Sequence, residues 1–246
     1  MIVGFVGSGS MAAAMARGLR GAVGAMIFTD GGSGRAAALA AEVGGEALAT
    51  NRELAERADV VVLAVKPAAL GTAAAELGGA NTVVSLLGAT PLEKVSAAFP
   101  GAGVVRLMPN VGVEVRKGVL CVAGDLDPAL REMLGALGHV VDLPDSQFDA
   151  ATAVMGCAPA YLALAVEAIA DAGAADGLDE ELARELVVET TAGTAELLRV
   201  RHPADVRKAV ASPGGSTEAG LEALDRKGAR EAFEAAVRAS LERMRG

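Results

Sequence analysis

Short runs of β-branched and aliphatic residues alternate with alanine-rich stretches along the first part of the chain. Each run is almost continuously apolar, whereas several stretches between them carry apolar residues at helical spacing, as Ala36, Leu39 and Val43 do. Continuous apolar strands separated by helices are typical of a parallel sheet covered on both faces. The pattern predicts a doubly wound α/β domain with strands at residues 1–7, 25–30, 59–65, 82–87, 103–108 and 118–123, and a possible seventh at 139–143.

The strand pattern stops near residue 148. Residues 148–173 are apolar nearly all round and rich in small side chains, which predicts a long helix buried on several sides. Helical spacing continues towards the C-terminus, clearest in Phe233, Val237 and Leu241. We therefore expect an α/β domain over residues 1–147 and an all-α domain over residues 148–246. So much apolar helical surface predicts a dimer or a larger assembly formed through the second domain.

A glycine-rich turn follows the first expected strand. Gly7, Gly9 and Ala12 fill a G-x-G-x-x-A spacing between this strand and a helix. Gly7 allows the tight turn, Gly9 lets a pyrophosphate approach the backbone, and Ala12 keeps helix and strand in contact. The context predicts a Rossmann-type dinucleotide site. Its candidate cofactor-binding residues are Gly7, Ser8, Gly9, Ser10, Met11 and Ala12.

Residues after the second expected strand bear on the choice between NADH and NADPH. Asp30 stands where a carboxylate would bond the ribose 2′-hydroxyl of NAD and repel a 2′-phosphate. Ser33 and Arg35 lie just beyond it and could hold such a phosphate instead. The balance slightly favours NADH and leaves NADPH open.

A break between two helical stretches near the C-terminus marks a second candidate site. Residues 212–217 read SPGGST. Pro213 ends the preceding helix, and Gly214 and Gly215 permit a tight turn. Ser216 and Thr217 then begin the next helix, where backbone N–H groups have no partner within the helix. The arrangement can hold an anion, while a plain turn between helices explains the same residues.

Composition narrows the class of partner. A net charge of −9, a single Tyr and no Trp disfavour nucleic acid and anionic membrane surfaces, and the longest apolar stretch carries Pro159 and Glu167. Cys121 and Cys157 form no CxxC pair and have no nearby histidine, so we expect no metal site. The first residues lack the basic segment of a signal peptide. We expect a soluble, cytoplasmic protein that acts on a small molecule, without nucleic acid or membrane as partner.

Three stretches, taken together and in order, resemble the pyrroline-5-carboxylate reductase family: GSGSMA at 7–12, AVKP at 64–67 and AVASPGGSTEAGLEAL at 209–224. VVRLMPN at 104–110 and GCAPAYLALAVEAIADAG at 156–173 look like two further blocks. The resemblance implies a Rossmann domain followed by an all-α dimerisation domain. It also implies NAD(P)H-dependent reduction of the cyclic imine 1-pyrroline-5-carboxylate to L-proline, the last step of proline biosynthesis.

The resemblance further implies roles for single residues. Asn51 would contact the adenosine side of the cofactor, and residues 85–88 would lie along the dinucleotide. Thr217 is the candidate catalytic residue, bonding the ring nitrogen while backbone N–H groups of residues 214–217 hold the substrate carboxylate, in a site completed across the dimer. The further cofactor contacts are Ala64, Val65, Lys66, Pro67 and Gly88. The substrate contacts are Ser212, Gly214, Gly215, Ser216 and Thr217.

The chain departs from the family pattern in three places. Val111 and Gly112 replace Thr-Pro, and Cys157 and Ala158 replace Ser-Gly. Gly31 stands where a basic residue is frequent, which weakens the argument for NADPH.

Two other functions compete with the reductase. A β-hydroxyacid dehydrogenase needs a lysine on the long helix, and the chain has none between Lys117 and Lys208. A dinucleotide sensor without turnover is the second alternative. The altered blocks allow a sensor, and the intact turn at 212–217 disfavours it.

Overall fold

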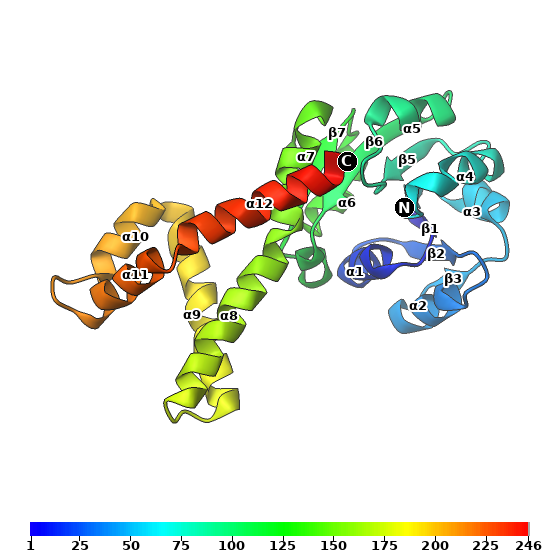
Figure 1. The fold of residues 1–246 in the computed structure, drawn as a ribbon. Helices are drawn as coiled ribbons and strands as arrows, with labels where there is room; N and C mark the ends of the chain where they lie inside the picture. Colours follow the sequence, from blue (N-terminus) through cyan, green and yellow to red (C-terminus); the bar gives the residue numbers. More distant parts are fainter. Residues whose placement is uncertain (246) are drawn as a thin grey trace. The chain divides into compact units, whose positions relative to one another are not determined.

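The computed structural model describes residues 1–245, which form an α/β unit over residues 1–156 and an all-α unit over residues 157–243 (Figure 1). The expected class, a Rossmann-type sheet followed by a helical domain, is confirmed.

An eight-stranded sheet forms the centre of the α/β unit, in the order β3-β2-β1-β4-β5-β6-β7-β8. Its strands are β1 (Ile2–Val6), β2 (Ala25–Thr29), β3 (Glu46–Ala47), β4 (Val60–Leu63), β5 (Thr82–Ser85), β6 (Gly103–Pro109), β7 (Gly118–Ala123) and β8 (Gly138–Asp142). All seven expected strands are present. The additional strand, β3, pairs only two residues with β2. It contains no apolar run from which a strand could be predicted.

One strand pair departs from the expected parallel sheet. β6 and β7 are antiparallel, with Arg106 opposite Ala123 and Met108 opposite Cys121. The connection between them is a short 3₁₀ segment, Val111–Val115, whereas a parallel crossover needs a dozen residues or more. β8 then pairs parallel to β7, so the expectation of a wholly parallel sheet was wrong at this one junction.

Helices cover both faces of the sheet, as in Figure 1. Along β4, Val60 and Val62 face one core, and Val61 and Leu63 face the other. The first core includes residues of α1 (Ser10–Leu19), α2 (Arg35–Val43) and α6 (Pro128–Gly135). The second includes residues of α3 (Asn51–Arg57), α4 (Leu70–Glu76) and α5 (Leu92–Ala98). Crossovers on both faces leave the loops after the parallel strands together at one edge of the sheet.

A buried ion pair joins β6 to the segment that follows the sheet. Arg106 is 4% exposed, and its Nη1 donates to Asp145 Oδ1 at 2.8 Å. The guanidinium carbon lies 4.5 Å from the ring centre of Phe148, and Asp145 Oδ2 accepts from the N–H of Leu92 at 3.1 Å. The pair therefore fixes the start of α5 and the start of α7 (Phe148–Ala151) relative to β6.

The long helix expected over 148–173 is interrupted. α7 continues into a π-helical turn, Thr152–Gly156, and α8 (Ala158–Ala175) begins only after Cys157. Pro159 lies in the first turn of α8, where its missing N–H is tolerated, whereas inside a helix it would clash with the preceding turn. One unbroken helix through this proline was therefore the wrong expectation.

The all-α unit contains α8, α9 (Glu180–Val200), α10 (Pro203–Val210) and α11 (Ser216–Arg226), and α12 (Ala229–Arg245) follows. α8 packs against α9. The hydroxyl of Tyr161 on α8 lies 2.5 Å from Ser240 Oγ on α12. The unit is thus held both by neighbouring helices and by a contact between helices distant in sequence.

Much of the apolar surface of α8 and α9 is exposed in the single chain. Leu162, Leu164 and Ile169 on α8 are 57%, 65% and 59% exposed, and Leu186 on α9 is 50% exposed. The helical segment Asp145–Ala175 is long and apolar enough to cross a bilayer by length and composition, a test that core helices of soluble proteins also pass. From the sequence we expected no span, because this stretch carries Pro159 and Glu167. The chain itself leaves this apolar surface uncovered.

Candidate functional site

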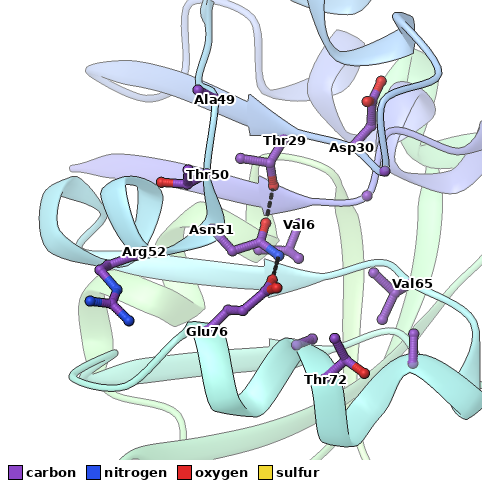
Figure 2. A pocket seen from close by; sticks show the side chains of 14 residues that line it. Val6, Thr29, Asp30, Ala49, Thr50, Asn51, Arg52, Val65, Thr72 and Glu76 are labelled. Carbon is purple, nitrogen blue, oxygen red and sulfur yellow. Dashed lines mark hydrogen bonds between the residues drawn. The ribbon is translucent and has the colours of Figure 1, made fainter.

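A pocket opens at the carboxyl ends of β1, β2 and β4, where the strand order reverses (Figure 2). This is the place where open α/β sheets bind their ligands. Among the residues expected to bind the cofactor, Gly7, Asp30, Asn51 and Val65 line the pocket. The polar residues that join them there are Thr29, Thr50, Arg52, Thr72 and Glu76.

The glycine loop has the geometry of a phosphate-binding turn. Gly7 has a φ of +94°, and a Cβ built on it would lie 2.6 Å from the carbonyl oxygen of Ala64. Gly9 is extended, with a φ of −80°, and a Cβ there would meet nothing within 4 Å. The helix α1 begins directly afterwards without a side-chain cap, so its first N–H groups are available to a ligand. Open space beside Gly9 together with these donors fits a pyrophosphate.

The other expected cofactor residues lie near the pocket without lining it. Ser8 is buried, and its hydroxyl donates to the carbonyl oxygen of Thr29 at 3.2 Å, so this hydroxyl is occupied within the protein. Ala12 is fully buried between helix and sheet. The remaining residues lie at the start of α1 or on the loops after β4 and β5, at the same edge of the sheet: Ser10, Met11, Ala64, Lys66, Pro67 and Gly88.

Asp30 organises the loop between β2 and α2. Its carboxylate accepts from the N–H groups of Ala36 at 2.8 Å, Gly32 at 2.7 Å and Ser33 at 3.0 Å, and from the Ser33 hydroxyl. These hydrogen bonds, the one from Ala36 most of all, lower the pKa of Asp30. Arg35 Nε donates to Ser33 Oγ at 3.0 Å. Ser33 and Arg35 are therefore bound within the loop, and neither is among the residues that line the pocket.

A row of three side chains crosses the pocket, as Figure 2 shows. Thr29 Oγ1 donates to Asn51 Oδ1 at 2.5 Å, and Asn51 Nδ2 donates to Glu76 Oε2 at 2.6 Å. Only Asn51 was expected from the sequence. Thr29 could have been found from its place at the end of a strand, directly before Asp30. Glu76 gives no such signal, because only the fold brings the end of α4 to this pocket.

The turn at 212–217 joins α10 to α11. Gly214 has a φ of +72°, and its N–H donates to the side-chain oxygen Oε2 of Glu218 at 2.7 Å. The N–H of Gly215 donates to the carbonyl oxygen of Ser212 at 2.9 Å. The helix α11 then begins at Ser216 without a side-chain cap. A carboxylate of the chain itself, that of Glu218, therefore occupies one of the N–H groups expected to hold the substrate.

Both cysteines are free. Cys121 is buried, which raises the pKa of its thiol, and Cys157 is half-buried. Across residues 1–245, no group of three or more His, Cys, Asp or Glu side chains is arranged to hold a metal ion.

Comparison with known proteins finds a matching family model for each of the two parts of the chain. Residues 2–88 match the family model described as NADP oxidoreductase coenzyme F420-dependent, and residues 145–246 match pyrroline-5-carboxylate reductase dimerisation. A curated pyrroline-5-carboxylate reductase from Synechocystis sp. is 39% identical over 204 residues, which cover 78% of this chain and 76% of that protein. The chain belongs to the pyrroline-5-carboxylate reductase family.

Two further members show that the similarity to pyrroline-5-carboxylate reductases extends over nearly the whole chain. The reductase of Methanosarcina acetivorans is 32% identical over 260 residues, covering 97% of this chain and 95% of that protein. A solved pyrroline carboxylate reductase from Plasmodium falciparum, with NADP bound, is 25% identical and has a TM-score of 0.87 over 99% of this chain and 97% of its own. The family resemblance and the two-part architecture are thus confirmed.

Proposed function

We propose that this chain reduces 1-pyrroline-5-carboxylate to L-proline with NAD(P)H, the last step of proline biosynthesis. The observation that carries the proposal is the similarity to curated pyrroline-5-carboxylate reductases, which reaches 97% of the chain. The pocket at the strand reversal and the phosphate-binding geometry of the glycine loop support it, because both suit a dinucleotide.

The residues of the chain would act mainly by positioning. NAD(P)H, when bound, supplies the hydride that the imine carbon accepts. The N–H groups at the start of α1 would hold the pyrophosphate beside Gly9. At the turn, the first N–H groups of α11 would hold the substrate carboxylate, and the Thr217 hydroxyl would bond the ring nitrogen. A ring nitrogen that is already protonated needs orientation and no strong acid from the protein.

The proposed reaction is tested by offering the purified protein 1-pyrroline-5-carboxylate with NADH and with NADPH in parallel. We expect oxidation of the cofactor and formation of L-proline, identified by chromatography. Cofactor binding without any proline would overturn the reductase and favour the sensor.

We also propose that residues 148–246 form a self-association domain, assembling as a dimer or a multiple of dimers. The exposed apolar side chains of α8 and α9 support this, since a single chain rarely exposes so large an apolar patch. A cytoplasmic location is proposed on the two free cysteines.

We propose that NADH is the preferred cofactor. Asp30 lines the pocket, so its negative charge would repel a ribose 2′-phosphate bound there, and Gly31 beside it offers no cation. Replacing Asp30 by alanine is expected to shift the ratio of kcat/KM for NADPH to that for NADH by about tenfold towards NADPH, the effect of about 1.4 kcal/mol. Steady-state kinetics with both cofactors measure the ratio. An unchanged ratio would mean that Asp30 serves only its own loop.

Replacing Glu218 by glutamine is expected to lower the KM for 1-pyrroline-5-carboxylate about twofold to fivefold and to leave kcat unchanged. The substitution removes a negative charge from a helix start proposed to receive the substrate carboxylate, where a charge is worth about 0.3–1 kcal/mol. Initial rates at saturating cofactor measure the effect. Glu222→Gln, one turn further along α11, is the matched control. A raised KM in E218Q alone would instead make Glu218 a support of the turn.

A further inference from the structure

Thr29 connects the glycine loop to the row of side chains in the pocket. Its main-chain carbonyl oxygen accepts from the Gly7 N–H at 3.0 Å and from the Ser8 hydroxyl at 3.2 Å. Its own hydroxyl donates to Asn51 Oδ1. Because Thr29 is 2% exposed, this end of the network is rigidly held by the core.

Glu76 decides which way the Asn51 amide points. An ionised carboxylate only accepts hydrogen bonds, so the amide nitrogen of Asn51 must face Glu76 and the amide oxygen must face Thr29. The threonine hydroxyl can donate or accept and would tolerate either orientation. Among the two partners of Asn51, Glu76 is therefore the one that selects a single orientation.

We propose that Glu76 is a positioning residue that fixes the Asn51 amide at the adenosine end of the pocket and thereby sets cofactor affinity. With one N–H bonded to Glu76, the second N–H of Asn51 is left as a donor of fixed direction beside the pocket. A donor held in place binds a ligand acceptor without losing orientational freedom on binding. The inference rests on the dinucleotide site proposed above.

The exposure of Glu76 makes the inference testable without damage to the fold. Glu76 is exposed at the end of α4, so substituting it changes little of the core. Glu76→Met keeps the length of the side chain and removes the acceptor, whereas Glu76→Gln keeps an acceptor oxygen. Glu132→Met, at an exposed position on α6 outside the pocket lining, is the matched control.

The experiment measures Kd for NADH by titration, and KM and kcat by initial rates, for these variants. We expect E76M to raise both Kd and KM for NADH about threefold to tenfold, the range for one hydrogen bond to a charged group partly screened by water. The kcat, the KM for 1-pyrroline-5-carboxylate and the thermal midpoint should not change. E76Q should lie between the parent protein and E76M, because its amide oxygen can accept from Asn51 while its amide nitrogen can donate to a flipped Asn51, so it no longer selects one orientation.

A second titration, with AMP, locates the effect at the adenosine end. E76M should weaken the binding of AMP by the same factor as the binding of NADH. Equal affinities of E76M and the parent protein, or a greater loss in E76Q than in E76M, would overturn the role of Glu76. Failure of the parent protein itself to bind NADH and AMP would instead overturn the dinucleotide site on which the inference depends.

Discussion

Replacing Gly9 by alanine is expected to raise the Kd for NADH about 10-fold to 100-fold while leaving the stability of the protein unchanged. The backbone of Gly9 is extended, and a Cβ there would meet nothing within 4 Å, so the folded chain accepts the methyl group. The same methyl group would occupy the space in which we place the pyrophosphate, and such overpacking costs about 1–3 kcal/mol. Cofactor titration and urea unfolding measure the two effects separately.

Gly7→Ala is the matched comparison, because it is expected to lower the stability of the protein, which Gly9→Ala leaves unchanged. The φ of +94° and a carbonyl oxygen only 2.6 Å from the new Cβ should lower the free energy of unfolding by about 2–4 kcal/mol. Gly9→Ala that binds NADH as tightly as the parent protein would show that the pyrophosphate does not lie beside α1.

Replacing Leu164 by aspartate is expected to prevent self-association and to reduce activity by about 100-fold or more. Leu164 lies on α8 and is 65% exposed in the single chain, so the substitution costs the single chain little. A carboxylate inside an apolar interface loses its hydration, which costs several kcal/mol. Activity should fall with assembly, because the substrate site is proposed to be completed across the dimer. Light scattering after gel filtration measures the assembly.

Ala129→Asp is the control for the added charge, since Ala129 is exposed on α6 in the α/β unit. It should leave both assembly and activity unchanged. An assembled, active L164D would exclude the surface around Leu164 from the interface.

The sequence was a good guide to the sheet wherever burial alone decides the structure. Runs such as residues 59–65 are apolar on both faces because helices cover both faces, and this predicts a strand reliably. A continuous run looks the same in a parallel and an antiparallel pair, so the reversal between β6 and β7 could not be recognised. β3 is too short and too polar to leave any pattern.

In the candidate site, too, some residues could be predicted from the sequence and others could not. Gly7 could be predicted because its backbone conformation restricts the residue type, and this restriction is visible in the local sequence. The hydrogen bonds of Asp30 to its own loop depend on how that loop closes, which no spacing reveals. Glu76 reaches Asn51 only because α3 and α4 lie side by side over one core. The roles proposed for Thr217 and the other substrate contacts stay predictions.

The uncovered leucines of α8 and α9 bear on how the stability of this protein should be reported. If association covers them, the free energy of that association adds to the free energy of folding, and the law of mass action governs both. The melting temperature then rises with protein concentration, and dilution shifts the population towards separate, less stable chains. A melting temperature for this protein has meaning only together with the concentration at which it was measured.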